Sequence, residues 1–497
     1  MNRNYYIKRI SALLLLVSVI SLSSCKKFLE TKQFTQSNED QFYKTASDFE
    51  QAVVGVYGAL RSIYTANSMF FLFTDMRSDN TSVYSPGGAR GPLSKSEYDD
   101  FTLTPNTEHM HSYWMSAYVV INRSNDVLAK LEASDIAQAL KDQYAGELKT
   151  LRATAYFNLV RLFGKVPLVL GRFENIDDAY KKGRDAVDDV YTQIVNDLTS
   201  ATSLLTVARN TGDKTGRIDK GTAHTLLADV YLTRKNFPLA AAEFKKVIDL
   251  NVYSLLPDYQ TLFSQGQQGN NETIWQIYFL TGVAGLGNHF PLYYAPINSQ
   301  NVLTTPGTGN PFGWCSPTND IYDAYDPSDA RRNSIAVGFT GQNGVYYDYK
   351  YIKNYVDLAS GTGSGLSGKD WYVYRYADVL LRYAEALNEV EGPDNAYQYI
   401  NQVRARAGLA DLSGLTKDQF REAVYEEERL ESPFEGKRWF DLNRTDRTLQ
   451  VMNAKLTTFD DPNTVGPAVA IQEHHKLLPI PALIRANSPA VDQNPGY

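Results

Sequence analysis

Two stretches of this sequence have the residue spacing of a pair of packed helices, and this pattern limits the fold more than any other feature. The first stretch covers residues 222–250. Its small and large apolar residues fall at the positions of a tetratricopeptide-type helix pair. They are Leu227, Ala228, Tyr231, Ala240, Phe244 and Val247. Small side chains where the helices approach, with a large ring one turn away, permit close packing.

The second stretch begins at residue 376, and its Gly-Pro-Asp-Asn sequence at 392–395 predicts the turn between two helices. The residues that match the first stretch are Tyr383, Ala384, Leu387, Ala396, Ile400 and Val403. A third pair starts at residue 148, with its partner helix displaced to 186–205. A set of unrelated amphipathic helices is the alternative interpretation.

Helices are also expected at 46–66, 112–131 and 416–432, from their apolar periodicity. Between about 262 and 370, Gly, Pro, Asn, Ser and Tyr dominate, and helical periodicity disappears. So long an irregular stretch is usually functional or disordered, and its many aromatic residues argue against disorder. We therefore predict a mainly α protein, in which tetratricopeptide-like helix pairs form a scaffold with a loop-rich, few-stranded insert.

The N-terminus has the order of features that protein export requires. Basic residues precede an uncharged run over 10–22, which is too short to cross a bilayer because a spanning helix needs about 20 apolar residues. Leu-Ser-Ser-Cys at 22–25 follows, and it resembles a bacterial lipobox. We interpret residues 1–24 as a lipoprotein signal peptide and Cys25 as the lipidated first residue of the mature chain. Several acyl chains, such as palmitate, would make a lasting membrane anchor.

Charge and cysteine content exclude further classes. The formal charge of the chain is -7, and removal of residues 1–24 makes it -10 because three basic residues leave. An acidic body argues against nucleic acid as a partner. Cys315 is the only cysteine besides Cys25, so no disulfide is expected within the mature chain.

No cofactor and no metal site is predicted. The sequence GSGLSG at 363–368 matches a dinucleotide-binding pattern, but the helix that follows it begins too late for that role. His109 and His111 are two residues apart, and His474 and His475 are adjacent. Neither pair has a third ligand at the spacing of a metal site.

The segment 426–444 is rich in both acidic and basic residues, so it is either an acid/base site or the polar shell of a helix. Planar guanidinium groups bind carboxylates bidentately, and we expect a structural network here, with Trp439 and Phe440 packed beneath it. The charged residues concerned are Glu428, Arg429, Glu431, Glu435, Arg438 and Arg444.

Several motifs occur in a specific order along most of the chain. They are LRATAYFNLVRLFGKVPLV (151–169), GTAHTLLADVYL (221–232), NNETIWQI (270–277), RYADVLLRYAEALNE (375–389), INQVRARAGL (400–409), ERLESPFEGKRWFDLNR (428–444), LLPIP (477–481) and QNPGY (493–497). In this order, and with the lipobox, the chain resembles the SusD/RagB-like surface glycan-binding lipoproteins.

The resemblance implies a division of the mature chain into two parts. The N-terminal part covers 25–269 and holds tetratricopeptide-like helices. The C-terminal part covers 270–497, with the loop-rich insert at about 270–370 and a helical segment at 371–445.

The resemblance also implies a function. The protein would be anchored by lipid to the outer membrane and face the cell exterior. It would bind an oligosaccharide and deliver it to a TonB-dependent, SusC-like transporter without a catalytic step. Two alternatives remain open: a lipid-anchored glycoside hydrolase that uses a pair of carboxylates, and a protein–protein adaptor that uses its helical repeats.

Sugar binding needs exposed aromatic planes for stacking and planar polar groups for hydrogen bonds. We expect these groups in the loop-rich regions, because ligand residues differ between members of the family. Trp314 is the first candidate, since the other four tryptophans lie in or beside scaffold motifs. The further candidates are Tyr293, Tyr294, Tyr346, Tyr347, Arg77, Asp79, Asn80 and Tyr84.

Overall fold

The computed structural model describes most of the chain from residue 42 to residue 497. The segments within this range that it does not describe are 66–67, 85–94, 174, 213–214, 265, 284, 305–310, 358–366, 456–463 and 466–468. The predicted signal peptide over 1–24 and the predicted lipidation site Cys25 lie outside the described residues.

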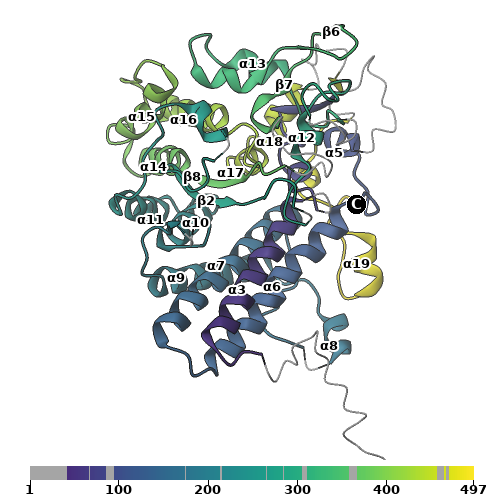
Figure 1. Ribbon diagram of the computed structural model, residues 1–497, viewed down its shortest axis with the longest axis vertical. Helices are drawn as coiled ribbons and strands as arrows, with labels where there is room; N and C mark the ends of the chain where they lie inside the picture. Colours follow the sequence, from purple (N-terminus) through teal and green to yellow (C-terminus); the bar gives the residue numbers. More distant parts are fainter. Residues whose placement is uncertain are drawn as a thin grey trace, which may run out of the picture.

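Long helices packed side by side form one half of the molecule (Figure 1). Their bounds are α3 Ala46–Arg61, α6 Met110–Glu132, α7 Gln138–Phe163, α9 Val187–Leu204, α10 Lys220–Thr233 and α11 Phe237–Asp249. Helix α6 packs on α3 and on α7, α7 packs on α9, and α9 packs on α10. The helical periodicity of the sequence thus corresponds to a continuous layered scaffold.

The three predicted helix pairs are confirmed. The first is α10 with α11, and the second is α14 (Tyr376–Glu391) with α15 (Tyr397–Ala407). The third is α7 with the displaced partner α9. Helix α11 also packs on α14, so the stack continues across the insert between them. The predicted division of the chain at residue 270 stays a prediction.

Local sequence signals set the ends of these helices. Thr45 accepts a hydrogen bond from the amide of Asp48, whose carboxylate accepts one in return, which makes a capping box at the start of α3. Asn236 caps α11, which has a proline in its first turn. At the end of α14, Gly392 has a φ of 91°, which favours glycine, and this position starts the predicted turn.

Shorter helices cover the rest of the scaffold and the insert. Their bounds are α4 Phe70–Phe73, α5 Ser96–Asp100, α8 Ile176–Lys181, α12 Phe290–Tyr294, α13 Asn319–Ala324, α16 Lys417–Glu431, α17 Arg438–Arg444, α18 Thr448–Lys455 and α19 Ala482–Asn487. The proline-rich sequence over 477–497 predicts an extended C-terminal tail, but Ala482–Asn487 within it form α19. Pro481 precedes α19, and a proline at this point is compatible with the start of a helix. Among the described residues, no helix is long and apolar enough to cross a membrane.

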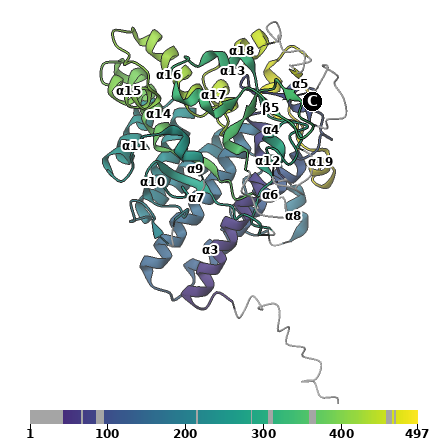
Figure 2. The same ribbon diagram turned by 45° about the horizontal axis from the view of Figure 1, so that its top comes forward.

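Among the described residues the strands are few and short, as the sequence predicts for the insert, and they pair in antiparallel orientation. Strand β2 (Thr273–Ile277) pairs with β8 (Trp371–Arg375). The other pairings are β1 (Thr81–Tyr84) with β3 (Ser316–Pro317) and with β9 (Thr464–Val465), β4 (Ile335–Ala336) with β7 (Tyr351–Ile352), and β5 (Phe339–Thr340) with β6 (Tyr346–Tyr347). In Figure 2 the insert lies over one end of the long helices.

The acidic and basic segment 426–444 joins the insert to the helical scaffold. Arg375, at the end of β8, is fully buried and donates hydrogen bonds to Glu272, Glu431 and Glu435 over 2.8, 2.7 and 2.7 Å. These partners come from two separate parts of the chain, and Arg375 itself comes from a third. The prediction of a structural ion-pair network is therefore confirmed.

The same network fixes the protonation state of its central carboxylate. Burial acts to raise the pKa of Glu431, but the guanidinium groups of Arg406, Arg375 and Arg331 outweigh it and lower the pKa to about 2. Trp439, in the same segment, is fully buried, as expected. A carboxylate held ionised by three arginines is a poor proton donor, which favours a structural role for it.

Candidate functional site

Three aromatic rings of the insert form a parallel stack. The rings of Tyr293 and Trp314 are 5.2 Å apart between centroids, with 6° between their planes. Phe312 lies 4.5 Å from Trp314, with 18° between planes. Tyr293 and Trp314 are buried, whereas 38% of Phe312 is exposed. The stack therefore reaches solvent at Phe312.

Backbone hydrogen bonds hold this stack in place. The segment 312–314 runs beside α12 and its C-terminal end, and the amide of Trp314 donates to the carbonyl of Tyr293 over 2.9 Å. The amide of Phe312 donates in the same way to Leu292 over 2.7 Å. Gly313 lies between them with a φ of 62°, a conformation that glycine adopts without strain. The stack is thus set by the main chain and does not depend on side-chain packing alone.

The surroundings of the stack are largely apolar. Burial raises the pKa of Tyr293 above its ordinary value and lowers that of His289, whose ring centroid is 6.4 Å from Tyr293. The ammonium group of Lys95 lies 5.7 Å from the centre of the Trp314 ring and forms an ion pair with Glu108. The stack therefore offers an aromatic face without a strong net charge, which suits the C–H face of a sugar ring.

Phe312 was not among the residues predicted from the sequence. The signal that could have identified it is the Phe-Gly-Trp sequence at 312–314, which places two aromatic residues on either side of one glycine. Gly313 adopts a positive φ without strain, and this turn of the backbone brings the two rings together.

The structure separates the two adjacent tyrosines of α12. Tyr293 faces Trp314, whereas Tyr294 stacks on Tyr355, with centroids 4.5 Å apart and 26° between planes. Tyr294 is fully buried, so it supports the site from behind. A direct role of Tyr294 in ligand contact would require solvent access that its side chain lacks.

The polar candidates of the earlier loop lie inside the scaffold. Asp79 accepts two hydrogen bonds from Arg438, over 2.8 and 2.7 Å, and Asn80 accepts one from Arg429 over 2.8 Å. Arg77 is buried over the ring of Trp439, 4.2 Å from its centre. Burial and the two arginines act in opposite directions on Asp79, and the arginines prevail and lower its pKa.

These three side chains therefore attach the loop to the 426–444 segment. Direct contact between a sugar and Arg77, Asp79 or Asn80 would require solvent access that they lack in this structure. Tyr84 ends β1, which pairs with β3 next to the Trp314 segment, and its role stays a prediction.

Tyr346 and Tyr347 form β6 of a small hairpin. Tyr346 is 60% exposed, and Tyr347 stacks on Phe339 with centroids 5.1 Å apart. Within the described part of the chain, no contact between aromatic rings joins this pair to the Trp314 stack. Tyr346 thus remains an exposed aromatic candidate on a separate strand, and its role stays a prediction.

Two other features of the described residues bear on chemistry. They contain no group of three His, Cys, Asp or Glu side chains that could hold a metal ion. Cys315, next to Trp314, is fully buried, and burial raises the pKa of its thiol well above the ordinary value. The thiol is therefore protonated and inert as a nucleophile.

Comparison with known proteins places this fold in one family. The sequence model of the SusD family matches residues 330–497, and a second model, described as "Starch-binding associating with outer membrane", matches residues 27–232. The chain belongs to the SusD/RagB-like family. Its mainly α fold with small sheets is the fold of that family, as predicted.

Full-length relatives agree with this assignment. The chain is 28% identical to SusD-like protein P2 of Formosa agariphila, with 97% of this chain and 98% of the relative covered. It is 25% identical to a SusD-like protein of Bacteroides ovatus, with 81% and 76% covered.

Solved structures are similar over almost the whole chain. A laminarin-binding SusD-like protein superposes with a TM-score of 0.78 at 26% identity, covering 92% of this chain and all of the other. Surface glycan-binding protein A from Bacteroides fluxus has a TM-score of 0.79 at 22% identity, with 91% and 100% covered. The second likeness supports the fold alone, because its sequence identity is low.

Proposed function

We propose that this protein binds an oligosaccharide at the Phe312–Trp314–Tyr293 stack. The observation that carries the proposal is the ring stack itself, which the main chain holds in place and which reaches solvent at Phe312. Aromatic planes of this kind stack on the apolar faces of sugar rings. Membership of the family, and its likeness to a laminarin-binding protein, support a glycan as the ligand.

The binding is proposed to be non-catalytic. Carboxylates of the acidic segment 426–444 are held in ion pairs with arginines and stabilise the fold. A glycosidase would instead need two carboxyl groups that flank an open cleft, one of them a proton donor.

The proposed location is the outer membrane, with an anchor on Cys25 and a TonB-dependent transporter as the partner that receives the glycan. The export signal and lipobox support the anchor, and the outer-membrane association in the family description supports the location. Cells that express the protein should incorporate labelled palmitate into it, and the Cys25→Ala variant should not. Purification from the outer membrane should bring a large transporter with it.

Calorimetric titration tests the binding function. The full chain, kept in a detergent without a sugar headgroup, is titrated with laminari-, malto- and xylo-oligosaccharides, and the sugars are then recovered and analysed. Binding to at least one series, with the sugar recovered intact, is the expected result. Shorter fragments in the recovered sugar would support the hydrolase alternative, and absence of binding to all three would contradict the proposal.

A further inference from the structure

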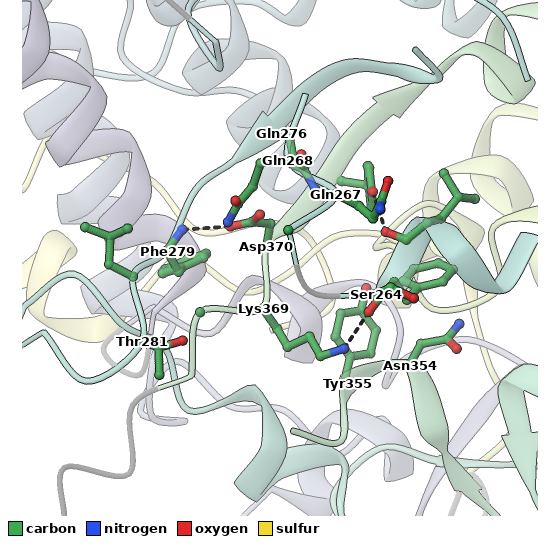
Figure 3. Close-up of a pocket in the computed structure, with 16 residues that line it drawn as sticks. Ser264, Gln267, Gln268, Gln276, Phe279, Thr281, Asn354, Tyr355, Lys369 and Asp370 are labelled. Atoms are coloured by element: carbon green, nitrogen blue, oxygen red, sulfur yellow. Dashed lines mark hydrogen bonds between the residues drawn. The ribbon is translucent and has the colours of Figure 1, made fainter. Parts of the chain in front are cut away.

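A second cavity lies on the other side of α12 from the ring stack. Its volume is about 350 Å³, within the range of small-molecule sites. It is bounded by the 3-10 turn Tyr259–Phe263 and the residues after it, by β2 and the loop after it, and by the start of β8. Figure 3 shows polar side chains from these segments around one space.

The cavity has aromatic walls and amide groups. Phe263, Phe279, Tyr355 and Tyr372 supply the aromatic surface. The amide side chains that line it are Gln267, Gln268, Gln276 and Asn354. Side-chain amides both donate and accept hydrogen bonds, so they match hydroxyl groups, which do the same.

One of these amides lacks a partner. Gln276 lies in β2 and is only 4% exposed, and its Oε1 atom has no hydrogen-bond partner among the described residues. A buried carbonyl oxygen without a partner costs free energy that a hydroxyl donor would recover. Gln276 is among the residues that line the cavity, and its Oε1 atom is itself buried, so a hydroxyl donor reaches this acceptor when the side chain turns towards the ligand.

The cavity carries little charge. Its charged lining residues are Lys369 and Asp370, which are adjacent in the chain. Lys369 donates to the carbonyl of Phe263 over 2.5 Å, and Asp370 accepts from the amide of Phe279 over 2.8 Å. No arginine is among the described residues that line the space, and a phosphate or carboxylate ligand would need more positive charge than one lysine beside an aspartate provides.

We propose that this cavity is a second ligand site, which binds a neutral polyhydroxylated molecule about the size of one sugar ring. The site is separate from the ring stack, because Tyr355 lines the cavity and contacts Tyr294, whereas Tyr293 contacts Trp314. The inference does not depend on the function of the stack, since the cavity has its own aromatic and amide groups.

Ligand-observed NMR with monosaccharides tests this site. The full chain in a detergent without a sugar headgroup is mixed with D-glucose, D-galactose or D-mannose, and with D-glucuronate and D-glucosamine as charged probes. At least one neutral hexose should bind. Both charged probes should bind with an affinity at least about fivefold lower than that of this hexose. Absence of binding for all three neutral hexoses, or a preference for either charged probe, would overturn the proposal.

Variants locate the bound hexose. Gln276→Leu removes the unpartnered oxygen, and Gln268→Ala changes an exposed rim residue that does not threaten folding. Each should weaken hexose binding by about fivefold, the value of one or two net hydrogen bonds. Phe312→Ala is the matched control and should leave hexose binding within about twofold, because no direct contact links it to the cavity.

Two results would overturn the assignment. One is hexose binding that neither Gln276→Leu nor Gln268→Ala changes. The other is hexose binding that Phe312→Ala abolishes, which would assign the hexose to the ring stack. Loss of oligosaccharide binding at the stack leaves this test unaffected, so failure of the two proposals can be distinguished.

Discussion

The rings of Tyr293 and Trp314 lie parallel, with 5.2 Å between centroids and 6° between planes, and the amide of Trp314 donates to the carbonyl of Tyr293 over 2.9 Å. The side-chain stack and the main-chain hydrogen bond thus join the same two residues. A binding surface fixed in this way needs little ordering when a ligand arrives, and this lowers the entropic cost of binding.

Replacement of the inner ring should affect stability as well as binding. Trp314 is 7% exposed, so Trp314→Ala leaves a cavity and should lower the free energy of unfolding by about 3 kcal/mol or more. Trp314→Phe keeps an aromatic plane and should cost less. Urea denaturation followed by circular dichroism measures both. Equal stability of Trp314→Ala and the wild type would contradict the described packing.

Arg375 should be among the most sensitive positions in the scaffold. Arg375→Met leaves Glu272, Glu431 and Glu435 buried without their shared partner, and loss of one member of a buried ion pair costs about 3–5 kcal/mol. Arg172→Met is the matched control, because Arg172 is largely exposed and pairs with Asp126 at the surface. That variant should cost about 1 kcal/mol or less.

Comparison of the two arginine variants by urea denaturation checks this expectation. A similar loss of stability in both would show that the buried network is no more important than a surface pair. A larger loss in Arg375→Met, together with failure to fold at 37 °C, would agree with the network as the junction between insert and helices.

Asp75 should make stability depend on pH. Burial raises the pKa of its carboxyl group to about 8, although the amide of Gly436 donates to it over 2.8 Å. The unfolded pKa is about 3.9, so the folded protein holds a proton that the unfolded chain loses between these values. The contribution of Asp75 to the free energy of unfolding is therefore greatest below about pH 4, and it decreases as the pH rises to about 8.

Asp75→Asn isolates this contribution, because the amide oxygen can still accept from Gly436 and no proton is lost. The free energy of unfolding of the variant should rise relative to the wild type between pH 4 and pH 8, by about 1.4 kcal/mol per pH unit at most. Urea denaturation at several pH values measures the difference. A difference that stays constant across this range would show that Asp75 is ionised in the folded protein.

The helical scaffold could be predicted from the sequence because its signals are local. The spacing of Ala228, Tyr231 and Ala240 predicts a helix pair. Gly392 favours the end of a helix through its own backbone conformation, which does not depend on the rest of the fold. The network around Arg375 was predicted only in part, because the segment 426–444 shows its carboxylates but does not show that Arg375 and Glu272 join them from distant strands.

The site was harder to predict because burial is a property of the whole fold. Arg77, Asp79 and Asn80 have the chemistry of sugar ligands, yet the structure uses them to attach a loop to the scaffold. The sequence proposed Trp314 and Tyr293 as separate candidates, and their contact became visible only once the path of the chain was known. The second cavity has no sequence signal, because Asn354 joins Gln267, Gln268 and Gln276 from a distant part of the chain.

The most direct test of the central claim is calorimetric titration of the Phe312→Ala and Phe173→Ala variants with laminarihexaose and with the best ligand of the oligosaccharide panel. Phe173 is 40% exposed and Phe312 is 38% exposed, so the two changes remove the same side chain at equal exposure. We predict that Phe312→Ala weakens binding by about threefold to tenfold, the value of one aromatic contact, and that Phe173→Ala leaves it unchanged. Equal affinity of the wild type and Phe312→Ala for a bound oligosaccharide would contradict the assignment of the glycan site to this ring stack.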